Sequence, residues 1–183
     1  MLGIIIGIVA LVLVLLFVAT VYNRLVGERN RVDNAWSQVE VQLQRRYDLI
    51  PNLVQTVKGY AEHESDTFEK VTQARAMSAA ASGPVEQAQA ENFLTSALRQ
   101  LFAVAEDYPE LRASANFASL QEDLGETENK IAISRQIYND TVLKYNTTVQ
   151  RIPTNIVAAI TGFSTRDEFD ADSRADRAPD VRF

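Results

Sequence analysis

The sequence has no cysteine, one histidine and seven scattered glycines, and each shortage excludes a class of site. Without cysteine the chain forms no disulfide bond and offers no thiolate ligand to a metal. The histidine, His63, precedes Glu64, but no second histidine completes the His-Glu-x-x-His pattern of a zinc helix. It is also the only candidate base for a serine or threonine nucleophile, and it lies among carboxylates. The glycines form no phosphate-binding loop, so we expect no metal, no cofactor and no catalytic residue.

Charge is unevenly distributed along the chain. Eighteen basic and twenty-four acidic residues give a net charge of −6, which makes nucleic acid an unsuitable partner. Residues 23–46 nevertheless carry five arginines against three acidic residues. We call Arg24, Arg29 and Arg31 the arginine collar. A collar beside a membrane is attracted to anionic lipid, although it also serves as an ordinary flanking anchor.

A long apolar segment, residues 2–22, contains no charged side chain. Its twenty-one residues span about 31 Å as a helix, which matches a hydrocarbon core of about 30 Å. The segment therefore predicts one transmembrane helix, in which Leu2, Leu11, Phe17 and Tyr22 are anchor residues. Gly3 and Gly7 have the small-residue spacing that pairs membrane helices, so a homo-oligomer is a possible consequence.

The orientation of the anchor follows from the arginine collar, because no basic residue precedes the apolar segment. We expect a single-pass protein of the inner or plasma membrane, with its N-terminus outside and residues 23–163 in the cytoplasm as a helical domain. The segment has no positive n-region and no clear cleavage site, so it reads as an anchor and not as a signal peptide.

Apolar residues recur with a mean step near 3.6 residues from Val32 to Ala61, which predicts a long first helix. Pro51 interrupts this pattern, and we expect a kink there; a turn at Asp48 to Asn52 is the alternative. Further helical patterns cover residues 66–81, 84–108 and 117–152, with a short one at 154–160 capped by Gly162. Short connections make neighbouring helices antiparallel, so the prediction is all-α, with an up-and-down four-helix bundle after the anchor.

Two Tyr-Asn pairs on the last long helix form a candidate interaction surface: Tyr138, Asn139, Tyr145 and Asn146. Each tyrosine falls in a row of residues spaced seven apart, which is typical of a packing seam, while each asparagine lies one step outside it. The amides then bond either a partner or a neighbouring helix, and the sequence leaves both open.

Residues 164–183 carry many charges and few apolar side chains, so we expect a disordered tail. Its end, with Val181, Phe183 and a free carboxylate, suits capture as an extended peptide at the sheet edge of a partner. A solubilising tail is the alternative.

A series of short motifs runs through the chain from the anchor to Phe163. They are Tyr22-Asn23 with Leu25 and Arg29-Asn30, Ala35-Trp36-Ser37-Gln38, Arg45-Arg46, Asp48-Leu49-Ile50-Pro51-Asn52-Leu53, Val57-Lys58-Gly59-Tyr60, His63-Glu64, Ala74-Arg75, Ala90-Glu91-Asn92, Tyr108-Pro109, Glu126-Thr127-Glu128-Asn129 with Ile131, Tyr138-Asn139, Tyr145-Asn146, and Pro153, Asn155 and Gly162-Phe163. In these motifs the sequence resembles the LemA family of bacterial membrane proteins. Ile152 departs from the family pattern, which commonly has an aromatic residue before this proline.

The resemblance implies a short exported N-terminus, one membrane helix and a cytoplasmic helical bundle, and it brings no catalytic residues. The family often looks associated with a membrane-anchored zinc metalloprotease, and it has a magnetosome relative. We therefore expect a noncatalytic scaffold or adaptor for other membrane proteins. The alternatives are a metal-dependent or hydrolytic enzyme, and a lipid-binding protein that remodels membranes through its arginine collar.

Overall fold

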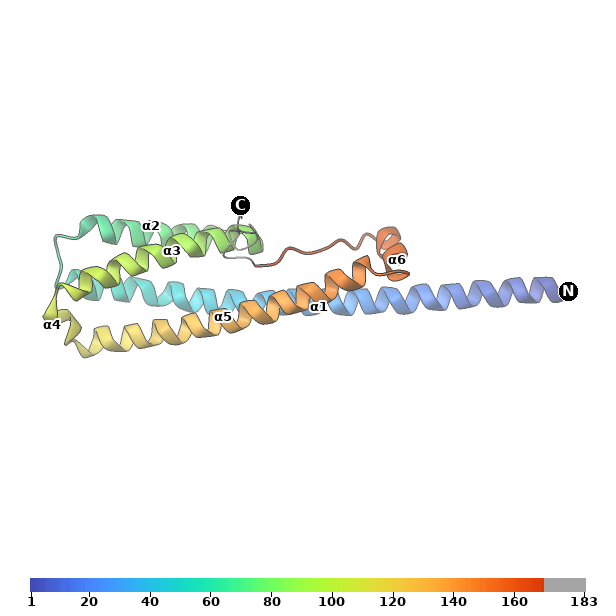
Figure 1. Cartoon of the computed structure of the whole chain (residues 1–183), viewed down its shortest axis with the longest axis horizontal. Helices are drawn as coiled ribbons and strands as arrows, with labels where there is room; N and C mark the ends of the chain where they lie inside the picture. The colour runs from blue at the N-terminus through green and yellow to red at the C-terminus, as the bar shows by residue number, and fades with distance from the viewer. Residues whose placement is uncertain (170–183) are drawn as a thin grey trace, which may run out of the picture. The chain divides into compact units, whose positions relative to one another are not determined.

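The computed structural model describes residues 1–169, and these residues contain helices and connecting segments but no strand. Figure 1 shows the helices α1 (Leu2–Lys58), α2 (Ser65–Ala80), α3 (Gly83–Glu106), α4 (Pro109–Arg112), α5 (Ala115–Gln150) and α6 (Thr154–Thr161). The all-α prediction is confirmed, whereas the four-helix bundle stays a prediction. The predicted tail contacts of Val181 and Phe183 lie outside the described residues.

Helix α1 continues through Pro51 to Lys58, so the alternative of a turn at Asp48 to Asn52 is wrong. Proline has no N–H to donate to the carbonyl four residues earlier, which belongs to Tyr47. That carbonyl instead accepts a hydrogen bond of 2.7 Å from Nε of Arg75 on α2. A side chain from another helix thus replaces the bond that Pro51 removes.

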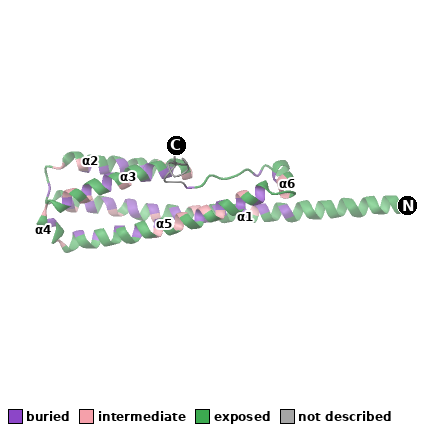
Figure 2. Cartoon of the chain, viewed as in Figure 1, coloured by how far each residue is buried: buried purple, intermediate pink, exposed green. Residues whose placement is uncertain are grey.

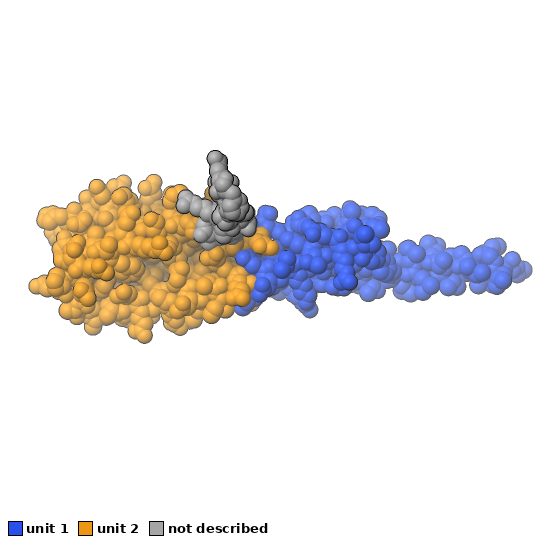
Figure 3. Space-filling view, viewed as in Figure 1, with its two compact units in different colours: residues 1–37, 137–167 blue, residues 38–136, 168–183 orange. Residues whose placement is uncertain are grey.

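The chain divides into two units, which Figure 3 colours separately. Unit 1 contains residues 1–37 and 137–167, and the described part of unit 2 contains residues 38–136, 168 and 169. Helices α1 and α5 each contribute residues to both units.

Unit 2 contains the second part of α1, α2, α3, α4 and the first part of α5. Helices α2 and α3 lie side by side and run in opposite directions (Figure 1). Gly83 at their junction has a φ of 79°, a left-handed conformation that glycine adopts without the Cβ clash of other residues. The helices of unit 2 bury apolar side chains along stripes, which Figure 2 colours purple. Val39, Leu53, Val71, Leu94 and Leu101 are among the most buried.

Unit 1 contains the first part of α1, the second part of α5, α6 and the segment after it. Residues 1–20 are exposed along their whole length, including the predicted anchor residues Leu2, Leu11 and Phe17. Burial begins at Val21 and Leu25. Trp36 packs with its ring centroid 5.2 Å from that of Tyr138 on α5. Helix α6 ends at Gly162 with a φ of 77°, as its predicted capping role requires.

Candidate functional site

The end of the apolar segment is the first candidate site. One described helix, α1, is long and apolar enough to cross a membrane. Where its uncharged part ends, the ring of Tyr22 meets that of Phe163 edge-on, with centroids 5.7 Å apart. The guanidinium of Arg29 lies 5.2 Å from the centroid of the same Phe163 ring, within the range of a cation–π contact.

Two members of the arginine collar therefore have partners within unit 1. Arg24 forms an ion pair of 3.0 Å with Glu28, one helical turn further along α1, and Arg29 lies against Phe163. All three collar arginines are exposed. The ion pair with Glu28 offsets the charge of Arg24, whereas the cation–π contact leaves the charge of Arg29 in place.

The second candidate site is the Tyr-Asn surface on α5. The hydroxyl of Tyr138 donates to the carbonyl of Asp167 at 2.7 Å, and that of Tyr145 to the carbonyl of Ser164 at 2.9 Å. Asn146 donates to the Arg166 carbonyl and accepts from the Arg166 N–H, both at 2.8 Å. Three of the four predicted residues thus bind residues 164–167 of their own chain, which we call the C-terminal strap.

The C-terminal strap also reaches α1, because the guanidinium of Arg166 lies 3.3 Å from the carboxylate of Asp33. Burial raises the pKa of the Tyr145 phenol, so this hydroxyl keeps its proton to a higher pH than an exposed tyrosine does. The sequence predicted disorder from residue 164 onward, yet the first residues of that tail are held by side chains. Further along, Phe169 is buried in unit 2, where the Arg135 guanidinium lies 4.6 Å from the centroid of its ring.

The third candidate site is a polar cluster inside unit 2 that the sequence reasoning missed. Its centre is Arg46 on α1, which is buried and lies 2.9 Å from the carboxylate of Glu91 on α3 and 3.1 Å from that of Glu128 on α5. It also donates to the Thr95 hydroxyl at 3.1 Å. Arg46 lies three residues after Leu43 and four before Ile50, both buried, so a charged residue on an apolar face was the available signal.

Tyr47 extends this cluster. Its hydroxyl donates to Glu91, and it accepts a hydrogen bond of 2.7 Å from Nε2 of Gln87. Gln87 also donates to the carbonyl of Ser78 at the end of α2. Burial, followed by the adjacent Glu91 carboxylate, raises the pKa of the Tyr47 phenol far above its usual value. The cluster therefore joins the helices of unit 2 through buried hydrogen bonds and ion pairs.

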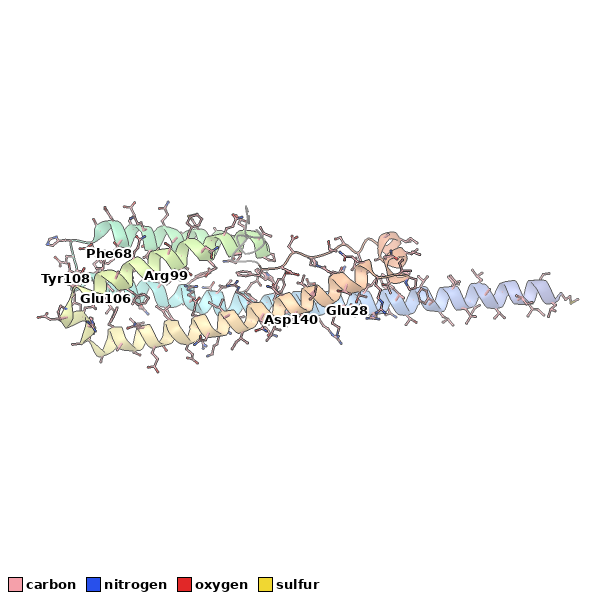
Figure 4. The ribbon with its side chains drawn as sticks, in the orientation of Figure 1. Glu28, Phe68, Arg99, Glu106, Tyr108 and Asp140 are labelled. Atoms are coloured by element: carbon pink, nitrogen blue, oxygen red, sulfur yellow. The ribbon has the colours of Figure 1, made fainter. Side chains whose placement is uncertain are left out.

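A groove of about 310 Å³ lies beside this cluster, between α3 and α5. Arg46, Thr95 and Glu128 line it together with the apolar side chains of Leu98, Phe102 and Leu124. Arg99, which Figure 4 labels on α3, and Gln121 also line it. Gly125 leaves part of the groove open, because a Cβ built at this position meets no atom within 4 Å. The groove can accept apolar side chains and offers charged groups at its margin.

Metal-binding residues do not gather in the part of the chain that the structure describes. Residues 1–169 contain no group of three or more histidine, cysteine, aspartate or glutamate side chains placed to hold a metal ion. His63 lies in the connection between α1 and α2.

Comparison with known proteins relates the chain to one protein family. The family model described as the LemA family matches residues 35–183. Magnetosome protein MamQ 2 of Paramagnetospirillum magneticum is 27% identical over 191 residues, covering 88% of this chain and 70% of that protein. Protein LemA of Metamycoplasma hominis is 26% identical over 140 residues, covering 74% of this chain and 63% of that protein. Magnetosome protein MamQ of Magnetospirillum gryphiswaldense is 25% identical, covering 81% and 64%.

Proposed function

The chain belongs to the LemA family, and from that premise we propose that it is a membrane-anchored helical adaptor that binds other membrane proteins and catalyses no reaction. One observation carries the proposal: the apolar residues 2–20 of α1 are all exposed, while α2, α3 and α5 each bury a stripe of apolar side chains. Exposed apolar surface of this extent is unfavourable in water and favourable in a bilayer. A bilayer therefore accounts for the segment.

The location and orientation belong to the same proposal. The anchor crosses the inner or plasma membrane once, and the arginine collar stays on the cytoplasmic side because basic flanks are retained there. Membrane anchoring is favoured over membrane remodelling, because the apolar segment accounts for membrane attachment by itself and Glu28 offsets the charge of Arg24. Liposome tubulation that depended on these arginines would favour remodelling instead.

We place the partner in the groove between α3 and α5. Leu98, Phe102 and Leu124 provide an apolar lining, and the exposed carboxylate of Glu128 can bond a polar group at the edge. An amphipathic helix from the cytoplasmic part of another membrane protein fits this combination, because such helices dock by laying their apolar face into a groove. The family resemblance makes a membrane-anchored zinc metalloprotease the first candidate.

Site-specific photo-crosslinking in native membranes tests this placement. A photo-crosslinking amino acid at Gln121 faces the groove, and one at Glu122 is the matched control, because this exposed neighbour does not line it. We expect adducts with an integral membrane protein from position 121 only. Gly125→Leu should abolish them by filling the groove, whereas Ala118→Leu, at an exposed alanine of the same helix, should not.

Two crosslinking results would contradict this placement of the partner. Equal adducts from positions 121 and 122, or adducts that survive Gly125→Leu, would move the partner to another surface. Deletion of Val181 to Phe183 then tests the tail: loss of adducts with an unchanged melting temperature would identify the C-terminus as the contact. A reproducible turnover by the purified chain would exclude a purely noncatalytic role.

A further inference from the structure

Helix α6 exposes an apolar face. Ile152, Ile156 and Ile160 are 78%, 59% and 81% exposed, respectively. Their spacing of four residues places Ile156 and Ile160 on one side of the helix, with Ile152 just before its first turn. The opposite side is also apolar, since Val157 and Ala158 are buried in unit 1. The outward face of α6 is therefore mainly apolar, with Thr161 at its end, whereas a water-facing helix surface normally carries polar residues along its length.

The segment around α6 is uncharged as well. Residues 152–165 contain no charged side chain, and Arg151 and Arg166 flank them. No other uncharged run of this length occurs outside the apolar segment of α1. Apart from the anchor itself, this is the part of the sequence with the composition of a lipid-facing surface.

The position of α6 within unit 1 connects this surface to the anchor. Phe163, which directly follows the α6 cap, meets Tyr22 with ring centroids 5.7 Å apart. Tyr22 is the last residue of the uncharged segment of α1, so this contact lies at the predicted membrane boundary. Figure 1 shows α6 beside α1 where this segment ends, and Figure 2 shows its exposed outer surface.

We propose that α6 lies in the interfacial layer of the membrane that holds α1, with Ile152, Ile156 and Ile160 inserted among the lipid headgroups and upper acyl chains. The inference rests on the proposed membrane anchoring and adds a second lipid contact to it. Interfacial helices insert their apolar face by about 5–10 Å. An interfacial helix without another anchor uses a basic face to reach the membrane surface. Helix α6 needs no basic face, because α1 already holds it at the membrane.

The surrounding residues suit a membrane boundary. Tyr22 is an aromatic residue with a polar tip, a type enriched at the headgroup level. Arg29, which contacts the Phe163 ring, lies seven residues after Tyr22 on α1. A guanidinium just outside the span remains near water and lipid phosphate groups. Lipid explains the exposed isoleucines and the uncharged composition together.

Fluorescence quenching in proteoliposomes tests the proposal with the full chain, which has no native cysteine to interfere. An environment-sensitive fluorophore is attached to Ile156→Cys or Ile160→Cys, and the vesicles contain phosphatidylcholine and phosphatidylglycerol, with or without nitroxide groups near the headgroup end of the acyl chains. Leu11→Cys is the control within the span. Ile137→Cys is the control outside it, because this 46% exposed residue adjoins Tyr138, whose ring contacts Trp36. Trp36 lies fourteen residues beyond Tyr22, about 21 Å along the helix.

We expect the nitroxide lipids to remove most of the emission at positions 11, 156 and 160 and little at position 137. Quenching at position 11 without quenching at 156 and 160 would overturn the α6 proposal and leave the anchor intact. Quenching at none of these positions would overturn both. Equal quenching at 137 and 160 would also overturn it, because the contact would then not be specific to α6.

A charge variant adds a second readout. Ile160→Asp in the chain labelled at position 156 should reduce the quenching, since a carboxylate opposes insertion into lipid. Leu143→Asp, at an exposed apolar residue of α5, should not. Unchanged quenching in the Ile160→Asp chain would contradict insertion of this face.

Discussion

The guanidinium of Arg46 on α1 lies 2.9 Å from the carboxylate of Glu91 on α3, and both side chains are buried. Glu128 on α5 approaches the same guanidinium to 3.1 Å. One cation therefore joins three helices of unit 2. A buried charge requires such partners, because an unpaired one loses its hydration without compensation.

Removing the cation should be severely destabilising. Arg46→Ala leaves Glu91 buried without its ionic partner, so we expect the free energy of unfolding to fall by about 3–5 kcal/mol. Arg45→Ala is the matched control, because this neighbour is exposed and its loss should change stability by less than about 0.5 kcal/mol. Urea denaturation of the full chain in detergent measures both. Similar values for the two variants would mean that the cluster contributes little.

The pKa of Tyr47 predicts a response to alkaline pH. Burial and the adjacent Glu91 carboxylate raise this pKa well above the ordinary value of a tyrosine, so the folded state holds the phenolic proton more tightly than the unfolded state. The resulting stability is fully present below about pH 10 and declines above it, at up to about 1.4 kcal/mol per pH unit. Tyr47→Phe should be less stable at neutral pH and show a shallower decline between pH 9 and 11. An equally steep decline would assign the effect to other groups, among them Tyr145.

The C-terminal strap should loosen when Asn146 is truncated. The Arg166 N–H donates to Asn146 at 2.8 Å, so Asn146→Ala removes the acceptor and the reciprocal bond. We expect amide exchange at Arg166 to accelerate about tenfold, which corresponds to about 1.4 kcal/mol. Thr147→Val is the control, since the Thr147 hydroxyl donates to the Leu143 carbonyl of its own helix. Hydrogen exchange followed by mass spectrometry distinguishes them, and equal rates would deny Asn146 this role.

Two glycine substitutions should act in opposite directions. Gly125 lies within α5, and an added Cβ meets no atom within 4 Å, so Gly125→Ala should stabilise the chain by about 0.5–1 kcal/mol. Gly162 caps α6 with a φ of 77°, where alanine is strained, so Gly162→Ala should cost about 1–2 kcal/mol. Thermal unfolding measures both effects. A lower melting temperature for Gly125→Ala would mean that the added Cβ at position 125 meets neighbouring atoms and that the groove has no free space there.

The proposed orientation predicts a labelling pattern in whole cells. A cysteine added at the N-terminus should react with an impermeant thiol reagent, and one added at the C-terminus should react only after permeabilisation, because the arginine collar stays inside. The chain has no other cysteine, so each signal has a single source. The reverse pattern would place residues 23–163 outside the cell, and the partners would then have to be sought among proteins exposed on that side.

The long-range polar contacts were beyond prediction from the sequence. The high charge and low apolar content of residues 164–183 predicted a disordered tail. Composition carries no information on distant contacts, and Tyr138, Tyr145 and Asn146 bond the strap. The sequence left open whether the amides of the Tyr-Asn surface bond a partner or a neighbouring helix. In the structure Tyr138, Tyr145 and Asn146 bond residues that lie 29, 19 and 20 positions further along the same chain, and such contacts form only on folding.

The sequence by itself determined the features that depend on local chemistry: the apolar segment from Leu2 to Tyr22, the all-α class and the α6 cap at Gly162. Hydrophobic periodicity and backbone stereochemistry act over a few residues, so they can be read in order along the chain. Only the tertiary structure decided between a continuous helix and a turn at Pro51, where Arg75 bonds the orphaned Tyr47 carbonyl, and it alone showed that Arg46 is buried while Arg45 is exposed. These outcomes depend on which helix supplies a partner for a polar group, and that pairing exists only once the helices have packed.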